Sequence, residues 1–122
     1  MVLVDTSVWV AHLRDGNVKL EVLLNEGNVV CHPFIIGELA CGNIVNRKEI
    51  IAFLQSLPMA IPADHDEVLQ FIENNSLMGS GLGYVDVHLL ASVQLTRISL
   101  WTLDKKLHKV SLEKELTHLL QQ

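Results

Sequence analysis

The chain has 122 residues, 49% of them apolar and 19% charged, so we expect one folded domain with a well-filled core rather than a disordered segment. Its 9 basic and 14 acidic residues give a net charge of −5, which argues against a protein held on nucleic acid by bulk charge alone. No apolar run reaches the roughly 18 residues of a membrane helix and no basic region precedes Asp5, so we expect a cytoplasmic protein without a signal peptide.

The first half of the chain alternates short apolar runs with longer segments of helical period. Pro33 suits the first turn of a helix and Gly42 suits a helix end, so these residues bracket one of the helices. We expect strands over residues 2–4 and 28–32, and helices over residues 6–14, 18–25 and 34–41.

The second half of the chain continues this alternation. Asp64 is a residue type that caps helices, and the glycines among residues 79–83 indicate a flexible loop. We expect helices over residues 47–57, 64–75 and 84–96, strands over residues 59–61 and 98–103, a short basic helix after Asp104, and a further helical stretch at the C-terminus.

The predicted strands are apolar throughout instead of at every second residue. Strands of this kind, alternating with helices, are typical of a parallel sheet that is covered on both faces. The sequence therefore predicts an α/β fold with a central parallel sheet. In such sheets, ligands bind beyond the carboxyl ends of the strands.

Four carboxylates stand at the ends of these elements, within apolar sequence. Asp5 and Asp104 each follow a predicted strand directly, and Glu38 lies in the helix that leaves the second strand. All three are therefore delivered to the carboxyl edge of the sheet. Asp86 lies in the first turn of a helix, just after the glycine loop, and joins them if that helix starts at the same edge.

Each of these acids also has an interpretation without a function. Asp5 and Asp104 could be helix N-caps, since an Asp side chain accepts hydrogen bonds from the exposed N–H groups of a first turn. Asp86 could be a first-turn acid favoured by the helix dipole, and Glu38 could face solvent. The acids among residues 64–73 have polar neighbours, and we expect them to be solvated.

A cluster of the four carboxylates would require a compensating cation. Desolvation of each carboxylate costs several kcal/mol unless a proton or metal ion balances its charge. Oxygen ligands without His or Cys suit Mg²⁺ or Mn²⁺. Two such ions about 4 Å apart would balance four negative charges and would suit a phosphoryl displacement. We therefore expect Asp5 to hold a metal ion.

Four stretches of the chain resemble one family in their residues and in their order: "LVDTSVW", "HPFIIGELACG", "GLGYVDVHLLAS" and "LWTLDKKL". They resemble the PIN-domain nucleases, and the match is closest to the VapC toxins of bacterial toxin–antitoxin pairs. The resemblance runs from residue 2 to about residue 108.

The resemblance implies a single three-layer α/β/α domain over residues 1–122, with an endoribonuclease activity that depends on Mg²⁺ or Mn²⁺. The substrate would be tRNA or another structured RNA, and the partners would be a small antitoxin and a second copy of the chain in a homodimer. The implied catalytic and metal-binding acids are Asp5, Glu38, Asp86 and Asp104, and the implied supporting hydroxyls belong to Thr6, Ser7 and Thr102.

Three lysines after the last acid, Lys105, Lys106 and Lys109, could contact RNA phosphates, or they could form a solvated helix face. For the other notable side chains we expect structural roles. His32 and His88 are predicted to be structural or exposed, and Cys31 and Cys41 to be reduced, buried thiols. Trp9 and Trp101 are predicted to lie in the core, with an interface role for Trp9 as the alternative.

Two rival functions remain at the level of sequence. A phosphoacceptor receiver domain has a similar length and an acidic Mg²⁺ site, but it needs an acidic pair after the first strand, and "DTS" offers one acid. A non-catalytic PIN-like binding module would not need all four acids. One departure from the family is the C-terminal stretch "SLEKELTHLLQQ", which predicts a helix or a frayed tail where many relatives have a last strand.

Overall fold

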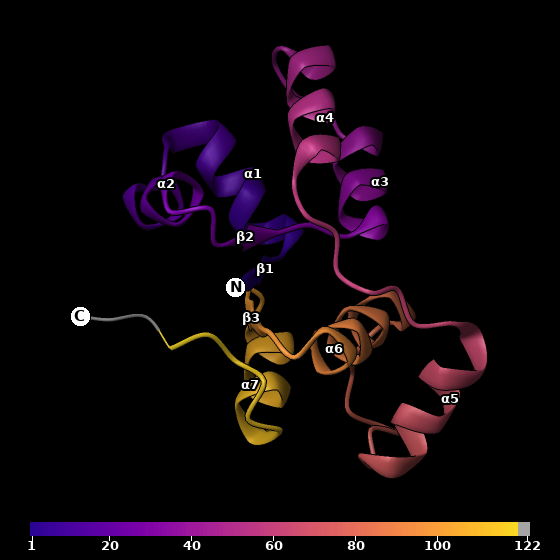
Figure 1. Ribbon diagram of the computed structural model, residues 1–122. Helices are drawn as coiled ribbons and strands as arrows, with labels where there is room; N and C mark the ends of the chain where they lie inside the picture. The colour runs from indigo at the N-terminus through magenta and orange to yellow at the C-terminus, as the bar shows by residue number, and fades with distance from the viewer. Residues whose placement is uncertain (120–122) are drawn as a thin grey trace.

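A parallel sheet of three strands lies at the centre of the computed structural model, which describes residues 1–119. The strands are β1 (Val2–Val4), β2 (Val29–Val30) and β3 (Ser99–Trp101). β1 lies between the other two, and Leu3 aligns with Val30 on one side and with Leu100 on the other. Figure 1 shows β1 in the middle of the molecule, with helices on both sides of the sheet.

Within the described residues, seven helices surround the sheet. They are α1 (Thr6–Asp15), α2 (Val18–Asn25), α3 (Pro33–Cys41), α4 (Arg47–Ser56), α5 (His65–Asn74), α6 (Tyr84–Thr96) and α7 (Lys105–Glu113). α3 and α4 lie side by side, and α5 packs against α6 (Figure 1). The predicted three-layer α/β/α architecture with a parallel sheet is confirmed.

The core follows from the apolar character of the strands. All three residues of β1 are buried, as are both residues of β2, because helices cover the sheet on both faces. Residues 87–93 of α6 are buried without interruption, so this helix lies inside the molecule, as expected of a helix that is apolar all round. α6 therefore presents Asp86 from the first turn of a buried helix.

Both outer strands have a further segment beside them. Met59 forms a parallel bridge with Cys31, next to β2, and Thr117 forms one with Leu100 in β3. The N–H of Ala60 donates to the Cys31 carbonyl at 2.8 Å, and the N–H of His118 donates to the Leu100 carbonyl at 2.7 Å. These segments cover the edges of the sheet, whose unpaired N–H and C=O groups would otherwise attract other chains.

The two outer segments correct two predictions. Residues 59–61 were expected to form a strand, but the segment forms a single β-bridge, between Met59 and Cys31. The predicted C-terminal helical stretch is wrong at residues 116–118, because α7 ends at Glu113 and the left-handed backbone of Glu115 (φ 59°) turns the chain back along β3. The part of that prediction on residues 120–122 lies outside the described residues.

The observed burial of the tryptophan and cysteine side chains agrees with the sequence-based prediction in all but one case. Trp9 and Trp101 both lie in the core, so the interface role considered for Trp9 is wrong. Cys31 is buried, and burial raises the pKa of its thiol to about 11. Cys41 is exposed, contrary to prediction, because it ends α3 at the surface. Within residues 1–119, no helix has the length and apolar character needed to span a membrane.

Candidate active site

Asp5 is buried at the end of β1 and receives two hydroxyl groups on one oxygen. The Thr102 hydroxyl, which follows β3, donates to Asp5 Oδ2 at 2.7 Å, and the Ser7 hydroxyl donates to the same atom at 2.8 Å. Asp5 occupies the N-cap position of α1, but its side chain caps no N–H group there. The N-cap interpretation of Asp5 is therefore wrong, and its carboxylate faces the neighbouring strand.

Asp104 is tied to the same group of hydroxyls. Its backbone N–H donates to Thr102 Oγ1 at 3.0 Å, and the N–H of Leu103 donates to Ser7 Oγ at 2.9 Å. The Asp104 side chain itself caps α7, with Oδ1 accepting from the Leu107 N–H at 2.9 Å. The capping interpretation of Asp104 is thus correct, and it accounts for one of its two oxygens.

Glu38 comes to the same edge from α3. Thr6, the first residue of α1, donates its hydroxyl to Glu38 Oε1 at 2.7 Å. This bond links the helix that follows β1 to the helix that follows β2, because parallel neighbouring strands release their helices at one edge. Glu38 is exposed there, as its solvated interpretation predicted.

Asp86 is half-buried, and its pKa is raised by burial. Its Oδ2 accepts from the N–H of Gly83 at 3.1 Å, which lowers the pKa but does not offset the burial. The negative charges of Asp5 and Asp104 raise the pKa of Asp86 further, so both lie near enough to repel its charge. The first-turn interpretation of Asp86 is correct for one oxygen, and the repulsion places the residue with the other acids.

The four carboxylates share one pattern of hydrogen bonding. In each, a single oxygen accepts the local hydrogen bonds: Asp5 Oδ2, Glu38 Oε1, Asp86 Oδ2 and Asp104 Oδ1. Within residues 1–119, the second oxygen of each carboxylate has no hydrogen-bond donor from the protein. One oxygen therefore fixes each side chain, while the other remains available to a ligand.

The carboxylates are not drawn together into a finished coordination sphere. Among the described residues, no three His, Cys, Asp or Glu side chains are close enough to form a ready-made metal site. Acids that repel one another stay apart unless a cation compensates their charges.

Lys106 lies beside the glycine loop that leads to Asp86. Gly81 adopts a left-handed backbone (φ +86°), and a Cβ atom placed on it would lie 3.4 Å from Lys106 Cδ. The long side chain of Lys106 thus extends over this loop, between the start of α7 and the start of α6. Lys105 and Lys109 are also exposed on α7.

Both histidines near the acids are buried. His32 accepts the Phe34 N–H on Nδ1 at 3.0 Å and has Ser92 Oγ 3.1 Å from Nε2, and burial lowers its pKa to about 4. Burial lowers the pKa of His88 as well, helped by the charge of His65. The Nδ1 atom of His88 has no hydrogen-bond partner in the described part of the chain, and its ring packs against Phe34 and Tyr84 instead. The structural role predicted for both histidines is consistent with this packing.

The pattern of the PIN domain matches residues 2–112, a span that contains all four carboxylates. This chain belongs to the PIN-domain family. Two curated relatives are both named Ribonuclease VapC32, from Mycobacterium tuberculosis strains CDC 1551 / Oshkosh and ATCC 25618 / H37Rv. Each is 45% identical over 108 residues, covering 88% of this chain and 87% of the relative. The resemblance to VapC-type PIN domains is thereby confirmed.

Sequence reasoning did not single out two exposed aromatic residues that are close in sequence to the candidate acids. Phe34 lies four residues before Glu38, and Tyr84 lies two residues before Asp86, but neither was singled out. The available signal was their position: helical residues four apart share a face, so Phe34 lies on the same side of α3 as Glu38.

Proposed function

We propose that this PIN domain is a metal-dependent endoribonuclease and the toxin of a toxin–antitoxin pair. Its substrate class would be tRNA or another structured RNA, and the reaction would be hydrolysis of a phosphodiester bond. The observation that carries the proposal is the set of carboxylates at one edge of the sheet, each with one oxygen fixed by a local donor and one oxygen open. The ribonuclease names of the relatives support the reaction class.

Four residues would hold the metal: Asp5, Glu38, Asp86 and Asp104. The donor set consists of carboxylate oxygens, which is the chemistry that Mg²⁺ and Mn²⁺ prefer. The raised pKa of Asp86 supports the same assignment, because neighbouring negative charges favour a bound cation as much as a bound proton. When bound, such an ion supplies a water nucleophile at neutral pH and stabilises negative charge on the phosphate.

The hydroxyl groups would orient the acids. Thr102 and Ser7 donate to one oxygen of Asp5, so its other oxygen keeps a fixed direction, and Thr6 does the same for Glu38. Side chains held in this way lose little further freedom when they bind a ligand, which is the usual contribution of groups behind a metal site.

Lys106 would contribute a positive charge for the RNA backbone, with Lys105 and Lys109 on the same helix. A chain with a net charge of −5 must concentrate its attraction for phosphates locally, and the three lysines follow Asp104 directly. We further propose that residues 1–122 form a single domain, that it acts in the cytoplasm, that it is neutralised by a small antitoxin protein, and that it forms a homodimer.

The first test is cleavage of total tRNA by the purified, antitoxin-free protein with Mg²⁺ or Mn²⁺. We expect discrete fragments that disappear with EDTA and in the Asp5→Asn variant. Asp66→Asn, which changes an exposed acid in the first turn of α5, is the matched control and should cleave as the wild type does.

Intact RNA with the wild-type protein in both metals would contradict the proposal. That result, together with a melting temperature that does not respond to either metal, would favour the non-catalytic binding module. Cleavage that persists in EDTA would contradict the role of the metal but not the ribonuclease activity.

A further inference from the structure

Two of the exposed aromatic side chains lie together on the helices that carry Glu38 and Asp86. The chain has six Phe, Trp and Tyr residues, and three of them are exposed: Phe34 at 39%, Phe53 at 44% and Tyr84 at 46%. Phe53 lies apart on α4, whereas Phe34 and Tyr84 both contact the ring of His88. We refer to Phe34, Tyr84 and the His88 ring between them as the aromatic patch.

The rings of the aromatic patch are held edge to face. The centroids of Phe34 and His88 are 4.8 Å apart with an interplanar angle of 67°, and those of Tyr84 and His88 are 4.5 Å apart with an angle of 87°. The Tyr84 hydroxyl lies 2.6 Å from His65 Nδ1 on α5. Both outer rings are therefore fixed by neighbours while a large part of each remains in water.

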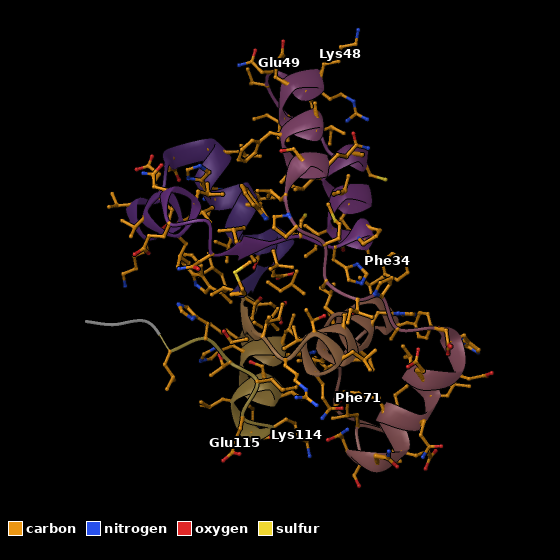
Figure 2. All side chains as sticks on the ribbon, in the orientation of Figure 1. Phe34, Lys48, Glu49, Phe71, Lys114 and Glu115 are labelled. Carbon is orange, nitrogen blue, oxygen red and sulfur yellow. The ribbon has the colours of Figure 1, made fainter. Side chains whose placement is uncertain are left out.

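The aromatic patch shares a helix face with one candidate acid and a helical turn with another. Phe34 and Glu38 are four residues apart on α3 and lie on one face of that helix. Tyr84 and Asp86 both belong to the first turn of α6, but residues two apart lie on different sides of a helix, and Tyr84 shares its side with His88. Figure 2 shows Phe34 at the end of α3 that faces α6.

An exposed and fixed pair of rings suits the flat face of a nucleic-acid base. Bases that are not paired in RNA are recognised by stacking on aromatic side chains, and this stacking tolerates any base. The net charge of −5 and the four carboxylates oppose binding of RNA through its phosphates. Stacking on the aromatic patch would supply affinity that does not depend on charge.

We propose that Phe34 and Tyr84 bind an unpaired base of the RNA next to the phosphodiester bond that is cleaved. This inference rests on the proposed ribonuclease function and assigns the aromatic patch as the place where a base of the substrate binds. The two residues are binding residues that position the RNA, and they take no part in the chemical step.

The test compares two fluorescein-labelled RNA decamers by fluorescence anisotropy in EDTA, where no cleavage is expected. One decamer is a mixed-sequence pool, and the other has the same sugar-phosphate chain without bases. The variants are Phe34→Leu and Tyr84→Leu, which remove a ring, with Phe53→Leu as the matched control on an exposed ring elsewhere. Tyr84→Phe keeps the ring and loses only the hydroxyl near His65.

We expect the wild-type protein to prefer the decamer with bases by about 5-fold to about 100-fold, the range of stacking on one aromatic residue. Phe34→Leu and Tyr84→Leu should lose most of this preference, while Phe53→Leu and Tyr84→Phe should keep it. In cleavage of total tRNA, Tyr84→Leu should raise KM with a smaller effect on kcat. Circular dichroism checks folding, and Tyr84→Leu decides alone if Phe34→Leu does not fold.

Equal wild-type affinity for the two decamers, or no binding of either, would overturn the inference. If the wild type nevertheless cleaves tRNA, the proposed function stands and only the role of the aromatic patch is wrong. A change from dimer to monomer in both leucine variants, with an unchanged preference for bases, would assign the aromatic patch to a protein interface and would also overturn the inference.

Discussion

Asp5 depends on a hydroxyl from the far end of the sequence. Thr102 is buried, donates to Asp5 Oδ2, and accepts the N–H of Asp104, so one side chain connects two of the candidate metal ligands. Thr6 makes a comparable bond to Glu38 at an exposed position. Substituting each threonine therefore allows the stability contributed by a buried hydrogen bond to a carboxylate to be compared with that of an exposed one.

We expect Thr102→Val to lower the free energy of unfolding by about 1–3 kcal/mol, because it leaves a buried carboxylate short of a donor. Thr6→Val should lower it by less than about 1 kcal/mol, because water replaces the lost donor. Urea unfolding of the metal-free proteins measures both changes. Equal effects of the two substitutions would show that the buried Asp5–Thr102 hydrogen bond contributes no more to the free energy of unfolding than the exposed Thr6–Glu38 bond does.

His32 should make the protein sensitive to acid. Its pKa is lowered from 6.5 to about 4 by burial in the folded state, so the unfolded chain binds the proton more readily. Stability from the neutral ring is complete above pH 6.5 and is lost as the pH falls from about 6.5 towards 4, with a total of about 3 kcal/mol.

The His32→Asn variant tests whether His32 causes the loss of stability as the pH falls. The Asn side chain can still accept the Phe34 N–H that caps α3, but it does not titrate in this range. Urea unfolding between pH 7 and 4.5 should show a shallower loss of stability in His32→Asn than in the wild type. Parallel pH profiles would mean that another group causes the acid sensitivity.

At the scale of single residues, the family resemblance named three hydroxyl residues that do hydrogen-bond to two of the predicted acids, but not which oxygen of each acid stays open. Asp104 both caps α7 and offers an open oxygen, and no pattern in the chain separates these two roles. The burial of His88 between two rings depends on α3 and α6 meeting in space, so adjacent residues carry no sign of it.

At the scale of elements, two glycines on either side of the site should respond in opposite ways to the same substitution. Gly37 lies inside α3 with nothing within 4 Å of an added Cβ, so Gly37→Ala should stabilise the protein by about 0.5–1 kcal/mol. Gly81→Ala forces a left-handed backbone on alanine and places its Cβ against Lys106, so it should destabilise by about 1 kcal/mol or more.

Thermal unfolding of both variants measures whether each substitution stabilises or destabilises the protein. If the path of Lys106 over the loop matters for RNA, Gly81→Ala should also weaken cleavage of tRNA more than Gly37→Ala does. Stabilisation by Gly81→Ala would show that the loop before α6 does not need its left-handed conformation.

The helices were predicted more accurately than the strands, for a physical reason. The start of α5 is marked in the sequence by Asp64 and Glu67, which form a capping box. The start of α3 is marked by Pro33 in its first turn. The segments at Met59 and Thr117 contribute one bridge each, and their pairing depends on distant residues of β2 and β3. The signals that start and end a helix lie within the local sequence, whereas the pairing of a strand depends also on a second segment that is distant in the sequence.

At the scale of the whole molecule, divalent metal should stabilise the fold. A ligand that binds only the folded state, present at a hundred times its Kd, adds about 2.7 kcal/mol, and a cation at this site would also relieve the repulsion of Asp86 by Asp5 and Asp104. We expect Mn²⁺ to raise the melting temperature of the wild type and of Asp66→Asn, and to raise that of Asp5→Asn much less. An equal rise in all three would indicate metal binding elsewhere.

The central position of β1 has a consequence for how the protein is made. Asp5 is synthesised 97 residues before its partner Thr102, an interval of about 5 to 20 seconds at typical speeds of protein synthesis. During that interval β1 has no β3 beside it, and its carboxylate has no hydroxyl donor from the last strand. A nascent chain that stops before Thr102 therefore cannot assemble the candidate site, which is complete only once β3 has paired with β1.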